Sequence, residues 1–365
     1  SMVYILASDN ERLSSILLPN TPTLTQLQCY IGVGKSSSLS SFDVSMCPNL
    51  EIFTCYRNNL SGTLDVSSNT KLVNFDCGEN NITAINMPDD EDTLTRFLCD
   101  NNDINTLDIS KNEALEFVDC SDNLSLASIT FPITSTLTFL ITNNTGLTTL
   151  DINGLTGLER LWSFNNPSLT SFNLPITNTL WQFDSSNTGV ANLDASMLSG
   201  LEFLRINNSS SLTSLTLPNT TTLQTFWMYG HNLPSVDFTP YTNLYTGLQY
   251  LDVGNSNLTG VDVSMLQNLI EFYCQDSDML TYLNIANGDN VNLDWMFANF
   301  NSSLTCIQVD DKNNADNKDT NQWRKDNSAS YEESCPGLSA KEFNKNMISL
   351  YPNPTKDIIT IKLNN

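Results

Sequence analysis

The single histidine limits the catalytic chemistry that this chain can carry out. His231 is the one candidate for a histidine general base or metal ligand, and no nucleophile motif of a Ser-His-Asp or Cys-His site accompanies it. The chain also has no glycine-rich phosphate loop. His231 stands where asparagine recurs at regular intervals elsewhere, at Asn58, Asn80, Asn102, Asn123 and Asn166. We therefore interpret His231 as a structural substitute for asparagine, and we expect no enzymatic activity and no cofactor.

Six of the nine cysteines recur at one position of the same interval, which predicts a row of buried thiols. They are Cys29, Cys55, Cys77, Cys99, Cys120 and Cys274. A structural zinc site needs ligands that converge as a tetrahedron, whereas cysteines one interval apart lie in a line. We expect these thiols to pack as small apolar side chains, and we place Cys47 on a connecting loop as a free thiol.

Carboxylates are the most abundant candidate ligands, because the chain carries 40 acidic residues against 16 basic ones, with a formal charge of −24. Two dense groups are Asp89, Asp90, Glu91 and Asp92, and then Asp310, Asp311, Asp316 and Asp319. Neither has the spacing of a calcium-binding loop, so we favour solvated acidic segments over calcium sites. Nucleic acid and anionic membranes are poor partners, since both attract clustered Lys and Arg. No apolar run reaches the roughly 18 residues that membrane insertion requires.

A leucine-based interval of 21 or 22 residues positions all of these side chains. In each unit a leucine is followed by apolar residues three and five positions later. From Leu50 to Leu223 the steps are 22, 22, 21, 22, 21, 22, 21 and 22, and longer steps of 26 and 25 flank this run. The units start at Leu24, Leu50, Leu72, Leu94, Leu115, Leu137, Leu158, Leu180, Leu201, Leu223, Leu248 and Leu269. So regular an interval indicates a solenoid.

The unit from Leu94 to Ile104 reads L-x-x-F-x-C-x-x-N-x-I, which resembles the consensus of leucine-rich repeats. The resemblance covers about residues 2–305. The units resemble the short bacterial repeats of internalin-type surface proteins, and more closely the cysteine-containing repeats of secreted Bacteroidota proteins. This resemblance implies a leucine-rich-repeat solenoid with a parallel β-sheet on its concave face. Loops and short 3-10 or extended segments are implied on the convex face.

The physical basis of the repeat is simple. Alternating apolar residues are typical of a half-buried strand. One turn cannot bury its own leucines, but turns stacked about 4.8 Å apart bury them in one continuous core. Units end alternately in a proline form, such as Phe131-Pro132, and an Asp-x-Ser form, such as Asp108-Ile109-Ser110. Because proline lacks an N–H, we expect these ends on the convex side, where no long hydrogen-bond ladder is needed.

Residues two, four and six positions after each starting leucine are expected to face outward on the concave side. Aromatic residues and arginine are frequent there, and the candidate ligand-binding set is Phe139, Arg160, Trp162, Phe164, Phe203, Arg205, Trp227, Tyr229, Tyr250 and Tyr273. Equivalent positions hold Tyr30, Tyr56 and Phe117. Two interpretations remain open. Cross-strand contacts of these rings stabilise a sheet by about 0.2–1 kcal/mol per pair, whereas exposed Trp, Tyr and Arg also dominate binding hot spots.

The two ends of the chain depart from the regular repeat. Ile5 and Ala7 already occupy repeat positions and Ser1-Met2 resembles a cloning remnant, so we expect a missing N-terminal cap and native sequence upstream. Residues 306–335 resemble the C-terminal cap of the Bacteroidota repeats, where a cysteine pair closes the last turn. The resemblance implies a Cys306–Cys335 disulfide, with two free thiols as the alternative.

The expected domain organisation is a solenoid at 1–305, a cap at 306–335, a linker at 336–346 and a truncated sorting domain at 347–365. The last segment contains Tyr351-Pro352-Asn353-Pro354 and resembles the start of the type IX secretion sorting domain, with its first strand expected at 358–363. That resemblance implies a Gram-negative bacterium whose protein is secreted or held at the outer-membrane surface.

These observations favour a non-catalytic binding module over an enzyme. Resemblance to internalin-type adhesins implies an extracellular protein as the ligand of the concave face. The alternative is a glycan-binding module for extracellular polysaccharide, because Trp and Tyr also stack on sugar rings. We expect a monomer that neither binds nucleic acid nor inserts into a membrane.

Overall fold

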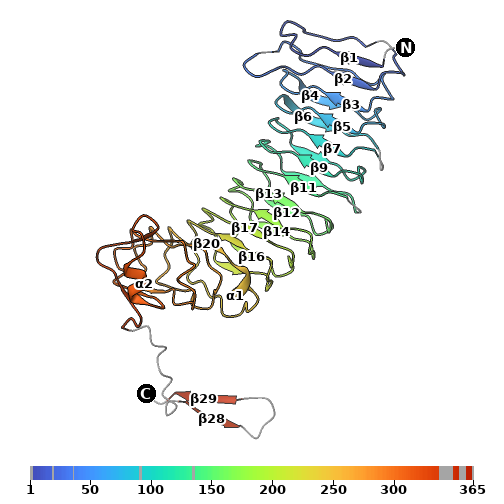
Figure 1. Ribbon diagram of the computed structural model, residues 1–365. Helices are drawn as coiled ribbons and strands as arrows, with labels where there is room; N and C mark the ends of the chain where they lie inside the picture. Colours follow the sequence, from blue (N-terminus) through green and yellow to red (C-terminus); the bar gives the residue numbers. More distant parts are fainter. Residues whose placement is uncertain are drawn as a thin grey trace.

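The computed structural model describes residues 3–18, 20–35, 37–89, 93–133, 136–336, 348–352 and 359–363. The chain winds into an elongated parallel β-solenoid (Figure 1), as the leucine interval predicts. The first strand lies at one end of the solenoid, and the short helix α2 (Lys312–Asp316) lies at the other. Among the described residues, no helix is both long enough and apolar enough to cross a membrane.

One long parallel sheet runs along the solenoid, and within the described residues it has 15 strands. In most of them the middle residue is buried and its neighbours face outward, so each strand contributes to both the core and the surface. In spatial order the strands are β1 (Tyr4–Leu6), β2 (Gln26–Gln28), β3 (Ile52–Thr54), β5 (Asn74–Asp76), β7 (Arg96–Leu98), β9 (Phe117–Asp119), β11 (Phe139–Ile141), β13 (Arg160–Trp162), β15 (Gln182–Asp184), β17 (Phe203–Arg205), β19 (Thr225–Trp227), β20 (Tyr250–Asp252), β22 (Glu271–Tyr273), β24 (Trp295–Ala298) and β26 (Trp323–Lys325).

The second side of the solenoid carries shorter sheets that follow the two-turn pattern of the sequence. The two-stranded sheets are β4 (Ser61–Asp65) with β6 (Asn81–Asn86), β8 (Thr106–Asp108) with β10 (Ser128–Thr130), β12 (Thr149–Asp151) with β14 (Ser171–Asn173), and β16 (Asn192–Asp194) with β18 (Ser214–Thr216). Each joins an Asp-x-Ser turn, or the similar Asp151-Ile152-Asn153 turn, to the proline turn that follows. The carboxylate of Asp108 accepts the N–H of Ser110 at 3.0 Å, and β10 ends two residues before Pro132. The expected placement of proline opposite the long sheet is confirmed.

The repeat leucines form the continuous core that the interval predicts. All twelve, from Leu24 to Leu269, are at most 2% exposed. Phe53, Phe75 and Phe97 stack on successive turns beside them, with ring centroids 5.6 and 5.3 Å apart. The longer step before Leu248 is taken up by a single helical turn, α1 (Leu244–Gly247). The extra residues of this longer unit therefore do not disturb the pairing of β19 with β20 or the alignment of the repeat leucines.

Buried asparagines join successive turns at the bend that follows each strand of the long sheet. The amide nitrogen of Asn80 donates to the carbonyl oxygens of Cys55 and Cys77, both at 3.0 Å. Its Oδ1 accepts the N–H of Leu60 at 3.1 Å. Asn102 and Asn123 repeat this arrangement. Because unpaired buried backbone groups are costly, one side chain stabilises two turns at once.

The C-terminal cap continues the solenoid. On the second side, β21 (Gly260–Asp262), β23 (Tyr282–Asn284), β25 (Cys306–Gln308) and β27 (Ser330–Glu332) form a four-stranded sheet. The Cys306–Cys335 disulfide is confirmed, with Cα atoms 5.9 Å apart. Trp323 on β26 covers the last turn and donates from Nε1 to the carbonyl oxygen of Leu293 at 3.0 Å. Beyond residue 336, β28 (Ile348–Pro352) pairs in antiparallel fashion with β29 (Ile359–Leu363).

Strand β29 lies within residues 358–363, where the sequence predicts the first strand of the sorting domain. It is the second strand of this segment, because β28, which includes Tyr351 and Pro352, precedes it. Asn353 and Pro354 of the motif, and residues 337–346 of the expected linker, lie outside the described residues. The sorting-domain assignment therefore stays a prediction.

Candidate binding surface

The outward residues of strands β7 to β24 form a surface that we call the long-sheet face. Because the parallel strands are in register, equivalent residues of successive turns stand side by side. One row contains Phe117, Phe139, Arg160, Gln182 and Phe203, and the next contains Asp119, Ile141, Trp162, Asp184, Arg205 and Trp227. The strands therefore bring the predicted aromatic and arginine residues together along one face.

An aromatic cluster occupies strands β9, β11 and β13. The ring of Phe139 makes edge-to-face contacts with Phe117 and Trp162, at centroid distances of 5.1 and 4.9 Å. The guanidinium of Arg160 lies 4.1 Å from the centroid of the Phe139 ring. As a result Phe139 is only 7% exposed. Phe139 therefore supports Trp162 and Arg160 from below, and it is the least accessible residue of the predicted set.

A second cluster lies two turns further along, on strands β17 and β19. Phe203 and Trp227 make an edge-to-face contact with centroids 5.3 Å apart. The guanidinium of Arg205 lies 4.7 Å from the centroid of the Trp227 ring and 3.4 Å from a carboxylate oxygen of Asp184. Since Asp184 is buried and close, the charge of Arg205 is already compensated within the protein.

A third cluster at β22 and β24 was missed by the sequence reasoning, apart from Tyr273. Phe297 contacts both Tyr273 and Trp295, at centroid distances of 5.1 and 6.0 Å. The guanidinium of Arg324 lies 4.4 Å from the centroid of the Phe297 ring. Trp295 and Phe297 belong to a turn that starts at Leu293, beyond the last unit assigned from the sequence. Leu293 lies 24 residues after Leu269, and extending the leucine pattern by that step would have found them.

The remaining predicted residues lie at the edges of these clusters. Tyr229 is half-buried, and its hydroxyl donates to a carboxylate oxygen of Asp276 at 3.4 Å. Phe164 and Tyr250 are also half-buried. Trp181 was not predicted, because it directly follows its starting leucine, yet it is 36% exposed and lies 6.0 Å from the guanidinium of Arg160. The long-sheet face thus includes Trp181 beside Arg160.

Half-buried carboxylates flank the aromatic clusters. Burial raises the pKa of Asp100 to about 6, and the neighbouring carboxylates Asp119 and Asp76 act in the same direction. Burial also raises the pKa of Asp252 to about 6, with a smaller effect from Asp276. Both shifts arise because these carboxylates are partly removed from water without a compensating cation. The long-sheet face is therefore acidic on both sides of its arginine-containing centre.

The cysteine and histidine predictions are confirmed. Six repeat cysteines are buried free thiols, and burial raises the pKa of Cys77 and Cys99 well above the ordinary value. Such thiols are poor nucleophiles. Cys47 is also free, but it is fully buried at the end of a turn. His231 is 3% exposed and its Nδ1 accepts the N–H of Leu233 at 3.1 Å, and burial lowers its pKa to about 4.

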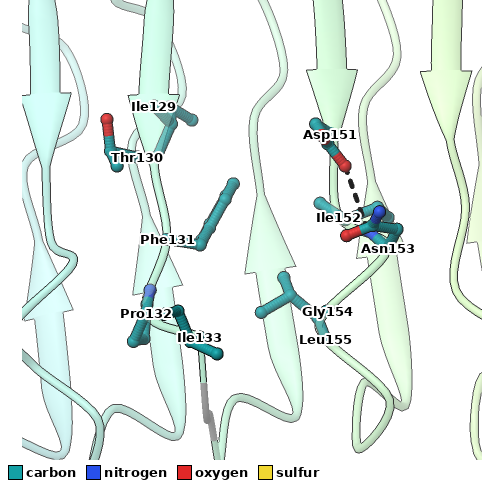
Figure 2. Close-up of a pocket in the computed structure, with 10 residues that line it drawn as sticks. All are labelled: Ile129, Thr130, Phe131, Pro132, Ile133, Asp151, Ile152, Asn153, Gly154 and Leu155. Atoms are coloured by element: carbon teal, nitrogen blue, oxygen red, sulfur yellow. Dashed lines mark hydrogen bonds between the residues drawn. The ribbon is translucent and has the colours of Figure 1, made fainter.

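One hollow of the described surface lies away from the long-sheet face. Figure 2 shows a hollow of about 360 Å³ between β10 and β12, on the side opposite the long sheet. It is lined by Ile129, Phe131 and Ile133 on one side and by Ile152 and Leu155 on the other, and its one carboxylate, Asp151, accepts the N–H of Asn153. Among the described residues, no three His, Cys, Asp or Glu side chains are grouped to hold a metal ion. Asp90, Glu91 and Asp92 of the acidic loop lie outside those residues.

Comparison with solved structures supports the same fold. The functional domain of InlJ from Listeria monocytogenes, described as including a cysteine ladder, has a TM-score of 0.54 and 24% sequence identity. A TDR receptor has a TM-score of 0.50 and 17% identity. YopM from Yersinia enterocolitica WA-314 is also similar, with a TM-score of 0.44, 17% identity and coverage of 83% of this chain and 79% of that chain.

The first two comparisons cover 80% of this chain each, but only 65% of the InlJ chain and 52% of the receptor chain. No protein-family model matches this sequence, and no curated protein does so. The solenoid, its leucine interval and its likeness to the InlJ domain define a leucine-rich-repeat fold.

Proposed function

We propose that this protein is a secreted or cell-surface binding module that recognises an extracellular protein through the long-sheet face. It acts without catalysis or a cofactor. The observation that carries the proposal is the alternation of stacked rings and arginines along β9 to β24. Trp, Tyr and Arg are the residues that most often dominate the energy of protein interfaces.

The ring contacts also support the other interpretation of these residues, in which aromatic side chains stabilise the sheet. Cross-strand pairs account for the presence of rings, but they do not require arginines stacked on the outer side of those rings. Arg160 adds a partly desolvated positive charge to a chain with a net charge of −24, and Arg205 adds a second stacked guanidinium, whose charge Asp184 compensates. Both features are typical of the centre of an interface.

The geometry of the rings favours protein over glycan. A sugar stacks on the open flat face of an exposed aromatic ring. Here Phe139 with Trp162, and Phe203 with Trp227, meet at interplanar angles of 82° and 74°. Arg160 and Arg205 cover one of the remaining ring faces in each cluster. A ridged, half-buried surface of this kind fits side chains of a partner protein better than a pyranose ring.

The proposed location follows from the C-terminal segment. The Tyr351-Pro352-Asn353-Pro354 motif resembles a type IX sorting signal, which supports export to the surface of a Gram-negative bacterium. The disulfide Cys306–Cys335 is consistent with an oxidising compartment.

The test is a paired screen of the purified protein against an array of extracellular proteins and an array of glycans. The Trp162→Ala/Trp227→Ala variant is screened in parallel. A protein partner that is captured by the wild type and lost in the variant supports the proposal. A glycan hit that is lost in the variant would assign the face to carbohydrate binding, and a hit retained by the variant would place the site elsewhere.

A further inference from the structure

Among the half-buried arginines of the described chain, Arg160 is the one that lacks a carboxylate partner. Arg57 lies 2.7 Å from Glu79 and Arg205 lies 3.4 Å from Asp184. Arg96 also stacks on a ring, 4.2 Å from the centroid of Phe117, but it is exposed to water. Within the described part of the chain, the guanidinium of Arg160 makes neither an ion pair nor a hydrogen bond. Its contacts are with the rings of Phe139 and Trp181.

These ring contacts leave the hydrogen-bonding edge of Arg160 available. A guanidinium that stacks on a ring uses its flat face, while its five N–H donors lie in the plane and point outward. The planar fork matches the two oxygens of a carboxylate, and such bidentate pairs are among the strongest polar contacts in proteins. Stacking on Phe139, which is itself buried, also fixes the fork before any ligand arrives.

The place of Arg160 in the sheet makes it a central anchor. Its strand, β13, has seven strands before it and seven after it in the order of the described long sheet. Trp162 lies on the same strand and Trp181 on the next turn, so apolar surface flanks the guanidinium on both sides. Interface hot spots concentrate in such desolvated central positions.

We infer that Arg160 binds a carboxylate of the protein ligand, which inserts between Trp162 and Trp181 and pairs with the guanidinium fork. This inference rests on the proposed function and names the chemistry of the ligand at its centre. The net charge of −24 repels an acidic ligand at long range, but that repulsion is screened beyond about 8 Å at physiological ionic strength. A direct, partly desolvated ion pair is screened much less. The contact with Arg160 therefore outweighs the long-range repulsion between the protein and an acidic ligand.

The experiment selects a phage-displayed library of random peptides on the immobilised full chain. The same selection is made on Arg160→Gln and on a matched control, Arg57→Gln, whose arginine is paired with Glu79 away from the clusters. We expect Asp and Glu to be enriched in peptides from the wild type and from Arg57→Gln, and the enrichment to vanish with Arg160→Gln. In a selected synthetic peptide, Glu→Gln is expected to weaken binding to the wild type by about ten- to hundredfold, and to change binding to Arg160→Gln little.

Amidation of the C-terminus of that peptide distinguishes a terminal carboxylate from a side-chain carboxylate. Arg160→Lys keeps the positive charge but lacks the planar fork, so it should bind the acidic peptide with an affinity between those of the wild type and Arg160→Gln. This variant provides the test if Arg160→Gln fails to fold. Peptides that lose binding to Trp162→Ala/Trp227→Ala yet show no acidic preference would overturn the inference while the proposed function stands. Peptides that bind this double variant unchanged, or a selection that yields none, would contradict both.

Discussion

The amide of Asn102 ties the backbone of Ile82, one turn earlier, to its own turn. Its Oδ1 accepts the N–H of Ile82 at 2.9 Å, while its Nδ2 donates to the carbonyl oxygens of Cys77 and Cys99 at 3.1 and 3.2 Å. Replacing Asn102 with alanine would leave several buried backbone groups without partners. We expect Asn102→Ala to lower the free energy of unfolding by roughly 2–4 kcal/mol, as measured by urea denaturation.

Asn105 provides the matched control for that experiment. Its side chain is exposed and makes a single longer bond, 3.4 Å, to the carbonyl oxygen of Thr83. Asn105→Ala should cost less than about 0.5 kcal/mol. Equal effects of the two substitutions would show that the buried asparagines do not hold the turns together.

Reduction of the Cys306–Cys335 disulfide should destabilise the cap. The two cysteines are 29 positions apart, and cross-linking a loop of that length gains about 3.6 kcal/mol in the chain-entropy model. Cys306→Ser/Cys335→Ser should therefore unfold at lower urea concentration than the oxidised wild type. Adding a reductant should lower the stability of the wild type and leave the variant unchanged, and an equal response of both would contradict this role.

His231 makes stability dependent on pH in one direction. Burial lowers its pKa from 6.5 to about 4, so between these values the unfolded chain binds the proton more readily than the folded protein. The stabilisation is fully present above about pH 6.5 and is lost as the pH falls toward 4. His231→Asn removes the titrating group and should reduce this acid-induced loss by about 2 kcal/mol. Unfolding curves at pH 7 and pH 4.5 measure it, and parallel losses in both proteins would argue against the assignment.

Phe300 is the one apolar residue among the described positions with a left-handed backbone at the bend after the strand. Its φ is +57° and it is 66% exposed, whereas Asn144, Asn165 and Asn208 hold this conformation in other turns. Asparagine tolerates that region better than phenylalanine. Phe300→Asn should raise the free energy of unfolding by about 0.5–1 kcal/mol, whereas a decrease would show that the exposed ring makes a stabilising contact.

Much of the fold could be predicted from the sequence, because the residues that recur at the leucine interval are the residues that pack in the core. A residue such as Leu161 faces the core in every turn for the same steric reason, so the register of the sheet follows once one unit is aligned. The alternation of unit ends like those at Pro132 and Asp108 also predicted a structural period of two turns, which the two-stranded sheets on the second side follow. Which pairs form sheets on the second side depends on backbone hydrogen bonds that side-chain patterns do not specify.

The candidate surface was harder to predict, because accessibility depends on neighbouring turns. The outward position of Phe139 was correct, but Phe117, Trp162 and Arg160 cover its ring, and only the structure shows this. Trp181 was missed because it stands one residue outside the expected outward positions. The absence of a carboxylate partner for Arg160 likewise depends on where Asp184 points, which no interval encodes.

The long-sheet face is the proposed ligand-binding surface of the protein. The decisive measurement is the dissociation constant of a partner recovered from the protein array, for the wild type and three variants. These are Trp162→Ala/Trp227→Ala, Arg160→Gln, and the control Ile133→Ser/Ile176→Ser, whose isoleucines are 94% and 71% exposed outside the clusters. Thermal unfolding of each variant verifies that it is folded.

We predict that the double tryptophan variant binds at least about a hundredfold more weakly than the wild type, since hot-spot residues each contribute 2 kcal/mol or more. Arg160→Gln should be intermediate, and the isoleucine control should match the wild type. If the double tryptophan variant binds as tightly as the wild type while the isoleucine variant does not, the long-sheet face is not the binding site.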